Sequence, residues 1–200
     1  MPSNTDDLVP EDAPGYYVTE KKTLEEYNKL DAEDESLVKW KKSLGLDTSA
    51  LLPVNPNDNR KVVILEMALL VDGKEPVVVD LSDESVLKTL SKNPFKVEEK
   101  SIYRLKIKFK IQHEIVTGIK YLQGIRKAGI TLDKLEEPLG SYAPNTVNKP
   151  YYEVTLPEME APSGMLARGT YGAVSKFVDD DKQVHLLLNW AVEIVKVGRA

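Results

Sequence analysis

Hydrophobic and basic residues alternate strictly along one stretch in the middle of the chain. Between positions 103 and 111, Tyr, Leu, Ile, Phe and Ile occupy the odd positions, and Arg and Lys occupy the even ones. A period of two places the two sets on opposite faces of a β-strand. The sequence therefore predicts a strand over 103–111 with one buried face and one basic, solvated face.

Further stretches have the β-rich composition of strands and are bounded by turn residues such as Asp-Gly, Asn-Pro and Ala-Pro. In the last of them, apolar residues recur at alternate positions and place Trp190 on the inner face. The stretches span residues 61–71, 77–81, 114–123, 151–156, 166–178 and 184–197. About seven strands without helices between them predict an all-β fold, an antiparallel β-sandwich.

The first 58 residues do not follow this period. Residues 1–35 hold 11 acidic and 3 basic side chains, a net charge of −8, whereas the whole chain carries −5. A segment so rich in acids and prolines buries too little apolar surface to offset its chain entropy. Pro53, Pro56 and the run Asn55–Asn59 then break the pattern. We expect a flexible acidic arm over 1–58 and a sandwich domain over 59–200.

Two short helices are expected within this arm. Thr23 and Glu26 have the spacing of a capping box at the start of the first. The second begins with the acids that follow Leu30 and ends with lysines before Gly45, an order that suits the helix dipole and a glycine stop. Its apolar stripe is too narrow to support an independent bundle. The arm is therefore predicted to fold against another surface.

The chain lacks the sequence motifs of the common catalytic and metal sites. It has no cysteine, which excludes disulfides, thiolate metal sites and prenylation of this chain itself. There is no nucleophile elbow and no phosphate-binding loop. His113 and His185 are interpreted as surface or partner-bonded residues, and the run Asp179–Asp181 fits a hairpin turn better than a calcium loop. We predict that the protein is not an enzyme and has no catalytic residues, no cofactor and no metal.

Two further classes are disfavoured. The negative net charge, and the lack of aromatic residues among the basic positions of 103–111, argue against nucleic-acid binding. No apolar run is long enough to cross a membrane, and the first ten residues lack the pattern of a signal peptide. We expect a cytoplasmic protein without stable membrane insertion.

Four separated stretches of the sequence resemble Rho GDP-dissociation inhibitors. They read Leu-Asp-Ala-Glu-Asp-Glu-Ser-Leu from Leu30, Glu-Ile-Val-Thr-Gly-Ile-Lys-Tyr from Glu114, Gly-Ser-Tyr-Ala-Pro from Gly140, and Ala-Pro-Ser-Gly-Met-Leu-Ala-Arg-Gly-Thr-Tyr from Ala161. Phe-Val-Asp-Asp-Asp-Lys follows from Phe177. The likeness runs from about residue 16 to the end of the chain, and the small size and acidic N-terminus resemble a fungal-type member.

The resemblance implies a fold and a function. The fold is an immunoglobulin-like β-sandwich, preceded by an arm that becomes helical on its partner. The partner is a prenylated Rho-family GTPase, with the GDP-bound form preferred. The arm would cover the switch regions and slow nucleotide release, while the sandwich would bury the geranylgeranyl group and extract the GTPase from membranes. The protein would be a monomer alone and form a 1:1 heterodimer with the GTPase.

The resemblance also implies residues that touch the GTPase protein. Tyr16, Asp34 and Ser36 would contact the switch regions, with Asp34 bonded to a threonine hydroxyl. A solvated helix start is the alternative reading of Asp34. Thr23 aligns with a serine that is phosphorylated to release the GTPase, and a simple helix N-cap is its alternative.

Two sets of residues are implied for the prenyl group and for the basic tail that precedes it. The pocket lining would be Leu69, Phe95, Ile115 and Trp190, with Tyr121 or Met165 as neighbours. Ordinary core packing is the alternative for each of them. The acids for the basic tail would be Asp133, Glu153, Glu158 and Glu160, for which loop solubility is the alternative. A carrier of prenylated or acylated proteins that does not affect nucleotide exchange is the alternative function.

Overall fold

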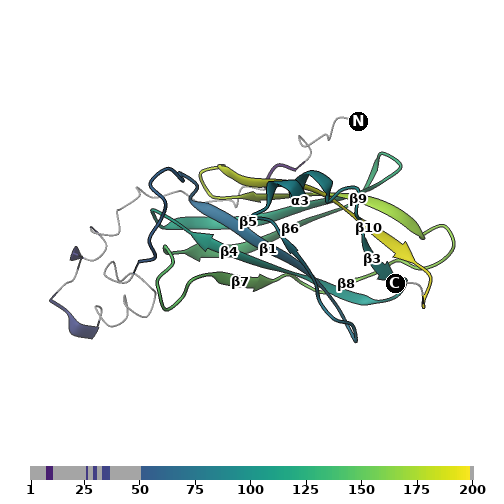
Figure 1. The fold of residues 1–200 in the computed structure, drawn as a ribbon, viewed down its shortest axis with the longest axis horizontal. Helices are drawn as coiled ribbons and strands as arrows, with labels where there is room; N and C mark the ends of the chain where they lie inside the picture. The colour runs from purple at the N-terminus through teal and green to yellow at the C-terminus, as the bar shows by residue number, and fades with distance from the viewer. Residues whose placement is uncertain (1–7, 11–25, 27–28, 31–32, 37–50, 199–200) are drawn as a thin grey trace.

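The structure, a computed structural model, describes residues 8–10, 26, 29–30, 33–36 and 51–198. Two β-sheets face each other across a shared core, which confirms the predicted sandwich (Figure 1). The first sheet consists of β2 (Val77–Asp80), β1 (Val62–Val71), β4 (Ile102–Ile111) and β7 (Tyr152–Thr155) in that order, with β8 (Met159–Glu160) also paired to β4. The second consists of β3 (Phe95–Glu98), β10 (Val184–Val195), β9 (Gly169–Val178), β5 (Val116–Lys127) and β6 (Ile130–Tyr142).

The strand with alternating residues is β4, and its two faces are as predicted. Leu105, Ile107 and Phe109 are fully buried in the core. Three of the four basic side chains on the opposite face lie beside acids from neighbouring parts of the first sheet, so most of this charge is balanced within the sheet. The nitrogen-to-oxygen distances are 2.7 Å for Arg104 and Asp72, 3.2 Å for Lys106 and Glu153, and 2.9 Å for Lys108 and Glu66.

The sequence pattern did not reveal β3, β6, β8 or the short helix α3 (Glu84–Thr89). Strand β6 is an edge strand with many exposed and charged residues, and it contains Pro138, so it has no clean alternation. Strand β3 has four residues and pairs in parallel with β10. The sandwich is therefore antiparallel except at this one edge.

A chain of hydrogen bonds crosses the buried face of the second sheet. The Nε1–H of Trp190 donates to Ser175 Oγ at 2.8 Å, and Ser175 Oγ lies 2.7 Å from the hydroxyl of Tyr121. Tyr121 gives its one proton to Gln123 Oε1 at 2.6 Å, so Ser175 must donate to Tyr121. Burial raises the pKa of Tyr121 far above its ordinary value, which keeps the phenol protonated. The chain thus runs in one direction from Trp190 to Gln123.

A smaller apolar cluster lies on the outer face of the second sheet and includes Leu8 from the predicted arm. The Leu8 side chain is 6% exposed and packs with Leu122, Val174 and Val178. The Nζ of Lys176 donates to its carbonyl oxygen at 3.0 Å. The described residues at the start of the predicted arm therefore rest on the sandwich.

The turn between β9 and β10 contains the expected hairpin and buries His185 against Asp179. The His185 Nε2 lies 2.9 Å from Asp179 Oδ2, and both side chains are 2% exposed. The other carboxylate oxygen of Asp179 accepts the backbone N–H of Gln183. Burial raises the pKa of Asp179, but the bonds from His185 and Gln183 outweigh it and leave this pKa below its ordinary value of 3.8. His185 is thus a partner-bonded histidine.

This pair predicts a pH-dependent contribution to stability. A lowered pKa in the folded state stabilises the protein at pH values above 3.8, and the contribution is lost as the pH falls through the lowered folded value. Asp179→Asn should lower the free energy of unfolding by about 2 kcal/mol at pH 7. Urea unfolding at pH 7 and at pH 3 checks this. The difference in the free energy of unfolding between wild type and variant should be smaller at pH 3 than at pH 7. An equal difference at both pH values would contradict a stabilising role of the ionised Asp179.

Candidate functional site

A cavity of about 450 Å³ opens between the two sheets near β8 and the end of β10. We call it the inter-sheet cavity. Both sheets contribute to it, and its size falls within the range of small-molecule sites. The strands that border it, β8 and the end of β10, lie at the right-hand end of the sandwich in Figure 1. Its apolar wall is formed by Tyr103 and Met159 from the first sheet and by Ile125, Tyr171, Val192 and Ile194 from the second.

The strand pattern explains why the sheets leave a gap at this end. Strand β7 ends at Thr155, and the next partner of β4, β8, has only two residues. The first sheet is narrow here, while β5 and β6 of the second sheet pair with each other up to Lys127 and Ile130 in a long hairpin. Side chains of the two inner faces therefore do not all meet. This leaves an opening between two sheets that otherwise pack about 10 Å apart.

The cavity has one polar point in its wall and two acids at its mouth. Gln123, the last member of the buried hydrogen-bond chain, lines it. Asp133 and Glu160 also line it and are solvent-exposed. Burial is the main cause that raises the pKa of Tyr103, and the negative charge of Asp133 is the second. The second cause agrees with a carboxylate close to the Tyr103 phenol. The site is thus an apolar slot with an acidic mouth.

Three of the four residues expected to line a prenyl pocket lie in the hydrophobic core, and none of them is among the described residues that line this cavity. Leu69, Phe95 and Trp190 are at most 5% exposed. The rings of Phe95 and Trp190 meet edge to face with centroids 5.7 Å apart. Phe95 pairs with Val192, which lines the cavity. Phe95 and Trp190 therefore lie next to a residue of the cavity wall, and Leu69 belongs to the same hydrophobic core.

Ile115 is not brought to this group. It is partly buried in the loop between β4 and β5, one residue before β5 begins. Ile125 of the same strand lines the cavity, and ten residues of strand correspond to about 30 Å. Ile115 therefore lies near the opposite end of the sandwich. Of the two suggested neighbours, Tyr121 is fully buried and Met165 is 83% exposed.

Sequence reasoning missed most of the cavity wall. Val192 and Ile194 share the face of β10 that holds Trp190, so the alternation of that strand could have identified them. Ile125 lies beyond residue 123, where the predicted strand ended. Met159 and Tyr103 come together through the β4–β8 pairing, which no local pattern reveals.

The four acids expected for a basic tail fall into two pairs. Asp133 and Glu160 lie at the cavity mouth. Glu153 and Glu158 lie on the outer face of the first sheet, where they contact Lys106 at 3.2 Å and Arg104 at 3.4 Å. The structure thus brings two of the four acids to the cavity.

The arm residues are described only in part. Asp34 and Ser36 are exposed, and Asp34 Oδ1 accepts the backbone N–H of Ser36 at 2.8 Å, as at the start of a helix. The backbone bond from Leu30 to Glu26 is also helical in its spacing. Tyr16 and Thr23, and most of the two predicted helices, lie outside the described residues.

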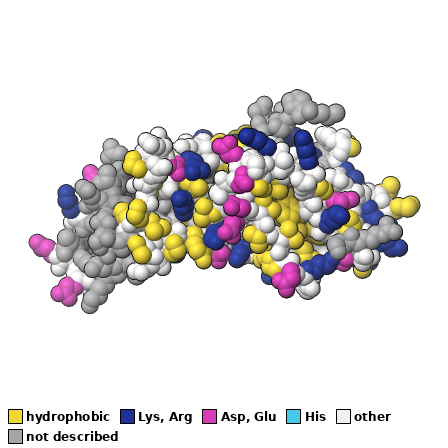
Figure 2. Space-filling model, in the orientation of Figure 1, with side chains coloured by type: hydrophobic (Ala, Val, Ile, Leu, Met, Phe, Trp, Pro, Cys, Tyr) yellow, Lys and Arg dark blue, Asp and Glu magenta, His cyan; other side chains and the backbone are white. Residues whose placement is uncertain are grey.

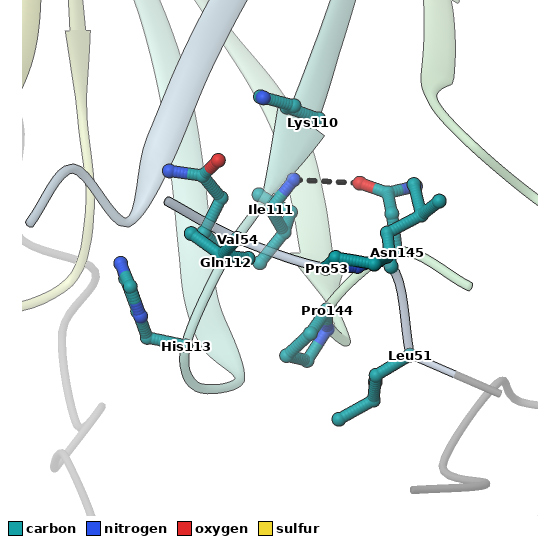
Figure 3. A pocket seen from close by; sticks show the side chains of 10 residues that line it. Leu51, Pro53, Val54, Lys110, Ile111, Gln112, His113, Pro144 and Asn145 are labelled. Carbon is teal, nitrogen blue, oxygen red and sulfur yellow. Dashed lines mark hydrogen bonds between the residues drawn. The ribbon is translucent and has the colours of Figure 1, made fainter. Parts of the chain in front are cut away.

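A second, smaller hollow of about 180 Å³ lies where the arm joins the sandwich. Figure 3 shows Pro53 and Val54 crossing the end of β4 at Ile111, beside Pro144 and Asn145. Asn145 Oδ1 accepts the backbone N–H of Ile111 at 2.7 Å, and the Leu52 N–H donates to the Asn145 carbonyl at 3.0 Å. These bonds fix the last part of the arm to the sandwich. Residues 51–54 therefore form a docked junction.

Among the described residues, no helix has the length and hydropathy needed to span a bilayer. No group of three or more acidic or histidine side chains in this part of the chain is arranged to hold a metal ion.

Comparison with known proteins identifies the family. The family model described as RHO protein GDP dissociation inhibitor matches residues 3–197. The Rho GDP-dissociation inhibitor of Saccharomyces cerevisiae is 59% identical over 90% of both chains. The protein of that name from Schizosaccharomyces pombe is 45% identical over 93% of this chain and 88% of its own. Human Rho GDP-dissociation inhibitor 1 is 37% identical over 88% of this chain and 83% of its own. The chain belongs to the Rho GDP-dissociation inhibitor family and resembles its fungal members.

Proposed function

We propose that this protein inhibits GDP release from Rho-family GTPases by holding a prenylated GTPase at two places. The inter-sheet cavity takes the geranylgeranyl group, and the acidic arm of residues 1–58 covers the switch regions. The observation that carries the proposal is the apolar cavity between the sheets, with acids at its mouth. The proposed complex is 1:1, cytoplasmic and favours the GDP-bound GTPase.

The lipid alone does not explain extraction from a membrane. A geranylgeranyl group has about 20 carbons, and its transfer into an apolar slot is worth on the order of 10 kcal/mol at about 0.8 kcal/mol per buried CH₂. The bilayer offers a similar gain. The free energy that favours the soluble complex must therefore come from protein contacts, which the arm and the acidic mouth supply in this proposal.

Each group of residues has a proposed role. Ile125, Val192 and Ile194 hold the outer part of the lipid, and the core residues Leu69, Phe95 and Trp190 form the deep wall that parts to admit the rest. Ile115 is too far along the sandwich to share this slot. If it contacts the partner, it contacts another part of it.

The acids act on the partner's charges. Asp133 and Glu160 attract the basic segment that precedes the lipid. Glu153 and Glu158 can join them only by exchanging the lysine and arginine that they now contact. In the arm, Asp34, Ser36 and Tyr16 contact the switch regions. A phosphate on Thr23 would add about −1.5 to −2 charge to the arm and promote release.

Deletion of residues 1–50 tests the division of labour. The deletion should abolish inhibition of nucleotide release, because the switch contacts are lost. It should change the affinity for a geranylgeranylated peptide by less than about twofold, because the described residues that line the cavity all lie between positions 103 and 194. Release of a fluorescent GDP analogue and peptide titration measure the two effects.

Two controls accompany this test. Removal of residues 1–7 leaves Leu8 on its apolar cluster and should preserve both activities. Asp34→Ala in the full chain should weaken GTPase binding and leave the melting temperature unchanged, since Asp34 is exposed. Retained inhibition after deletion of 1–50 would favour the alternative function of a lipidated-protein carrier.

A further inference from the structure

The loop between β8 and β9 directs two large apolar side chains into solvent. Met165 is 83% exposed and Leu166 is 92% exposed. The loop forms the right-hand tip of the molecule in Figure 1, and Figure 2 shows hydrophobic side chains protruding at that tip with basic side chains nearby. Single exposed apolar residues are common, but two adjacent ones beside a cavity mouth point to an interaction surface.

The backbone of this loop is held in place from several sides. Gly164 N–H donates to Glu99 Oε2 at 3.0 Å, and Ala167 N–H donates to the Gly164 carbonyl at 3.0 Å. From the β5–β6 hairpin, Lys127 Nζ donates to the Leu166 carbonyl at 2.8 Å. These bonds fix the shape of the loop without using its two apolar side chains. The loop is therefore built to display them.

The apolar surface continues around the cavity mouth. Ile130 and Leu132 on β6 are 66% and 56% exposed, and alternation along the strand places them on one face. Leu132 lines the cavity, as does Pro162 at the start of the loop. The loop and the hairpin tip thus border the same opening.

One exposed lysine flanks the apolar tip, and a second is bonded to the loop itself. Lys127 lies on the hairpin, and its Nζ donates to the carbonyls of Leu166 and Arg168 and to the Tyr171 hydroxyl. Lys100 is exposed and is tied to the base of the loop by a backbone bond to the Ala161 carbonyl at 2.9 Å. Arg168 is paired with Glu99 at 2.8 Å and so adds no net charge. Asp133 and Glu160 lie inward of this rim, at the cavity itself.

We infer that this end of the sandwich docks on the surface of an anionic lipid bilayer, with Met165 and Leu166 inserted at the acyl-chain boundary and Lys100 among the headgroups. The inference deepens the proposed function, because docking would place the cavity mouth at the membrane surface where a prenyl chain is anchored. It rests on the proposed function only in assuming that the cavity takes this chain. A bilayer accepts protruding side chains of any shape. A protein partner would need a matching pit, so the geometry favours lipid.

The absence of cysteine allows a direct test on the full chain without any GTPase. Leu166→Cys carries an environment-sensitive fluorophore and is mixed with phosphatidylcholine vesicles containing about 30% phosphatidylserine. The control is Val147→Cys with the same label, because Val147 is 63% exposed and follows Asn145 at the opposite end of the sandwich. We expect a blue shift at position 166 and none at position 147.

Variants then measure the contribution of each group. The double variant Met165→Ser and Leu166→Ser should lower vesicle partitioning at least about tenfold, since several buried carbons are removed. Val147→Ser should have no effect. Lys100→Gln should lower partitioning about fivefold, and the loss should shrink at high salt.

The outcomes separate this inference from the proposed function. An unshifted label at position 166 with the chain alone would overturn the inference, even if a geranylgeranylated peptide still binds. A blue shift that appears only when the GTPase is added would also overturn it, because the loop would then be a protein contact. Insertion without binding of that peptide in solution would sustain the inference and contradict the prenyl cavity.

Discussion

Replacement of Ile125 by tryptophan is expected to weaken the binding of a geranylgeranylated peptide about 100-fold. Ile125 lines the inter-sheet cavity and is only partly buried, so an indole can occupy the space without forcing the sheets apart. If the indole displaces about four carbons of the lipid, the loss is about 3 kcal/mol at 0.8 kcal/mol per CH₂. Titration with a fluorescent prenyl peptide measures it.

Two further variants make this result decisive. Met159→Trp fills the same cavity from the first sheet and should produce a loss of similar size, whatever Ile125→Trp does to the second sheet. Val147→Trp adds an indole at the opposite end and should leave affinity unchanged. Thermal unfolding establishes that each variant is folded. Full affinity in both folded cavity variants would rule out this cavity as the lipid site.

Replacement of Ser175 by alanine is expected to lower the free energy of unfolding by about 2–4 kcal/mol. The Ser175 hydroxyl is fully buried, accepts from Trp190 and donates to Tyr121. Its removal leaves the indole N–H without its acceptor and the phenol oxygen without its donor, in two residues that are at most 3% exposed. Ser163→Ala, at an exposed position, is the matched control and should cost less than about 0.5 kcal/mol.

A double-mutant cycle tests whether the hydrogen-bond chain acts as a unit. Tyr121→Phe removes the next hydroxyl, so its combination with Ser175→Ala should cost less than the sum of the two single changes. Chemical denaturation of the four proteins gives the coupling free energy. Strict additivity would show that Ser175 and Tyr121 stabilise the core independently.

The sequence predicted the sandwich well where one face of a strand is buried and the other is solvated. In β4 every second residue enters the core, so the period of two is visible in the residues themselves. Strand β6 lies at an edge, where neither face must be apolar, and it left no such pattern. The parallel partner β3 is too short for a period to appear.

The cavity could be inferred only in part. The strand pattern and the family resemblance both indicated Trp190, and the resemblance alone indicated Phe95, but a cavity forms where side chains fail to meet. That depends on the two-residue length of β8 and on where β7 ends, which are tertiary features. Ile115 illustrates the limit, because an apolar residue near a strand start gives no sign of which end of the sandwich it occupies.

The most direct test of the central claim is a methyl NMR titration of the protein with a geranylgeranylated peptide. The account predicts that the methyl signals of Ile125, Val192 and Ile194 shift on binding, while that of Ile111, at the opposite end beside the arm junction, does not. Binding that leaves the first three signals in place, or that moves chiefly the signal of Ile111, would contradict it.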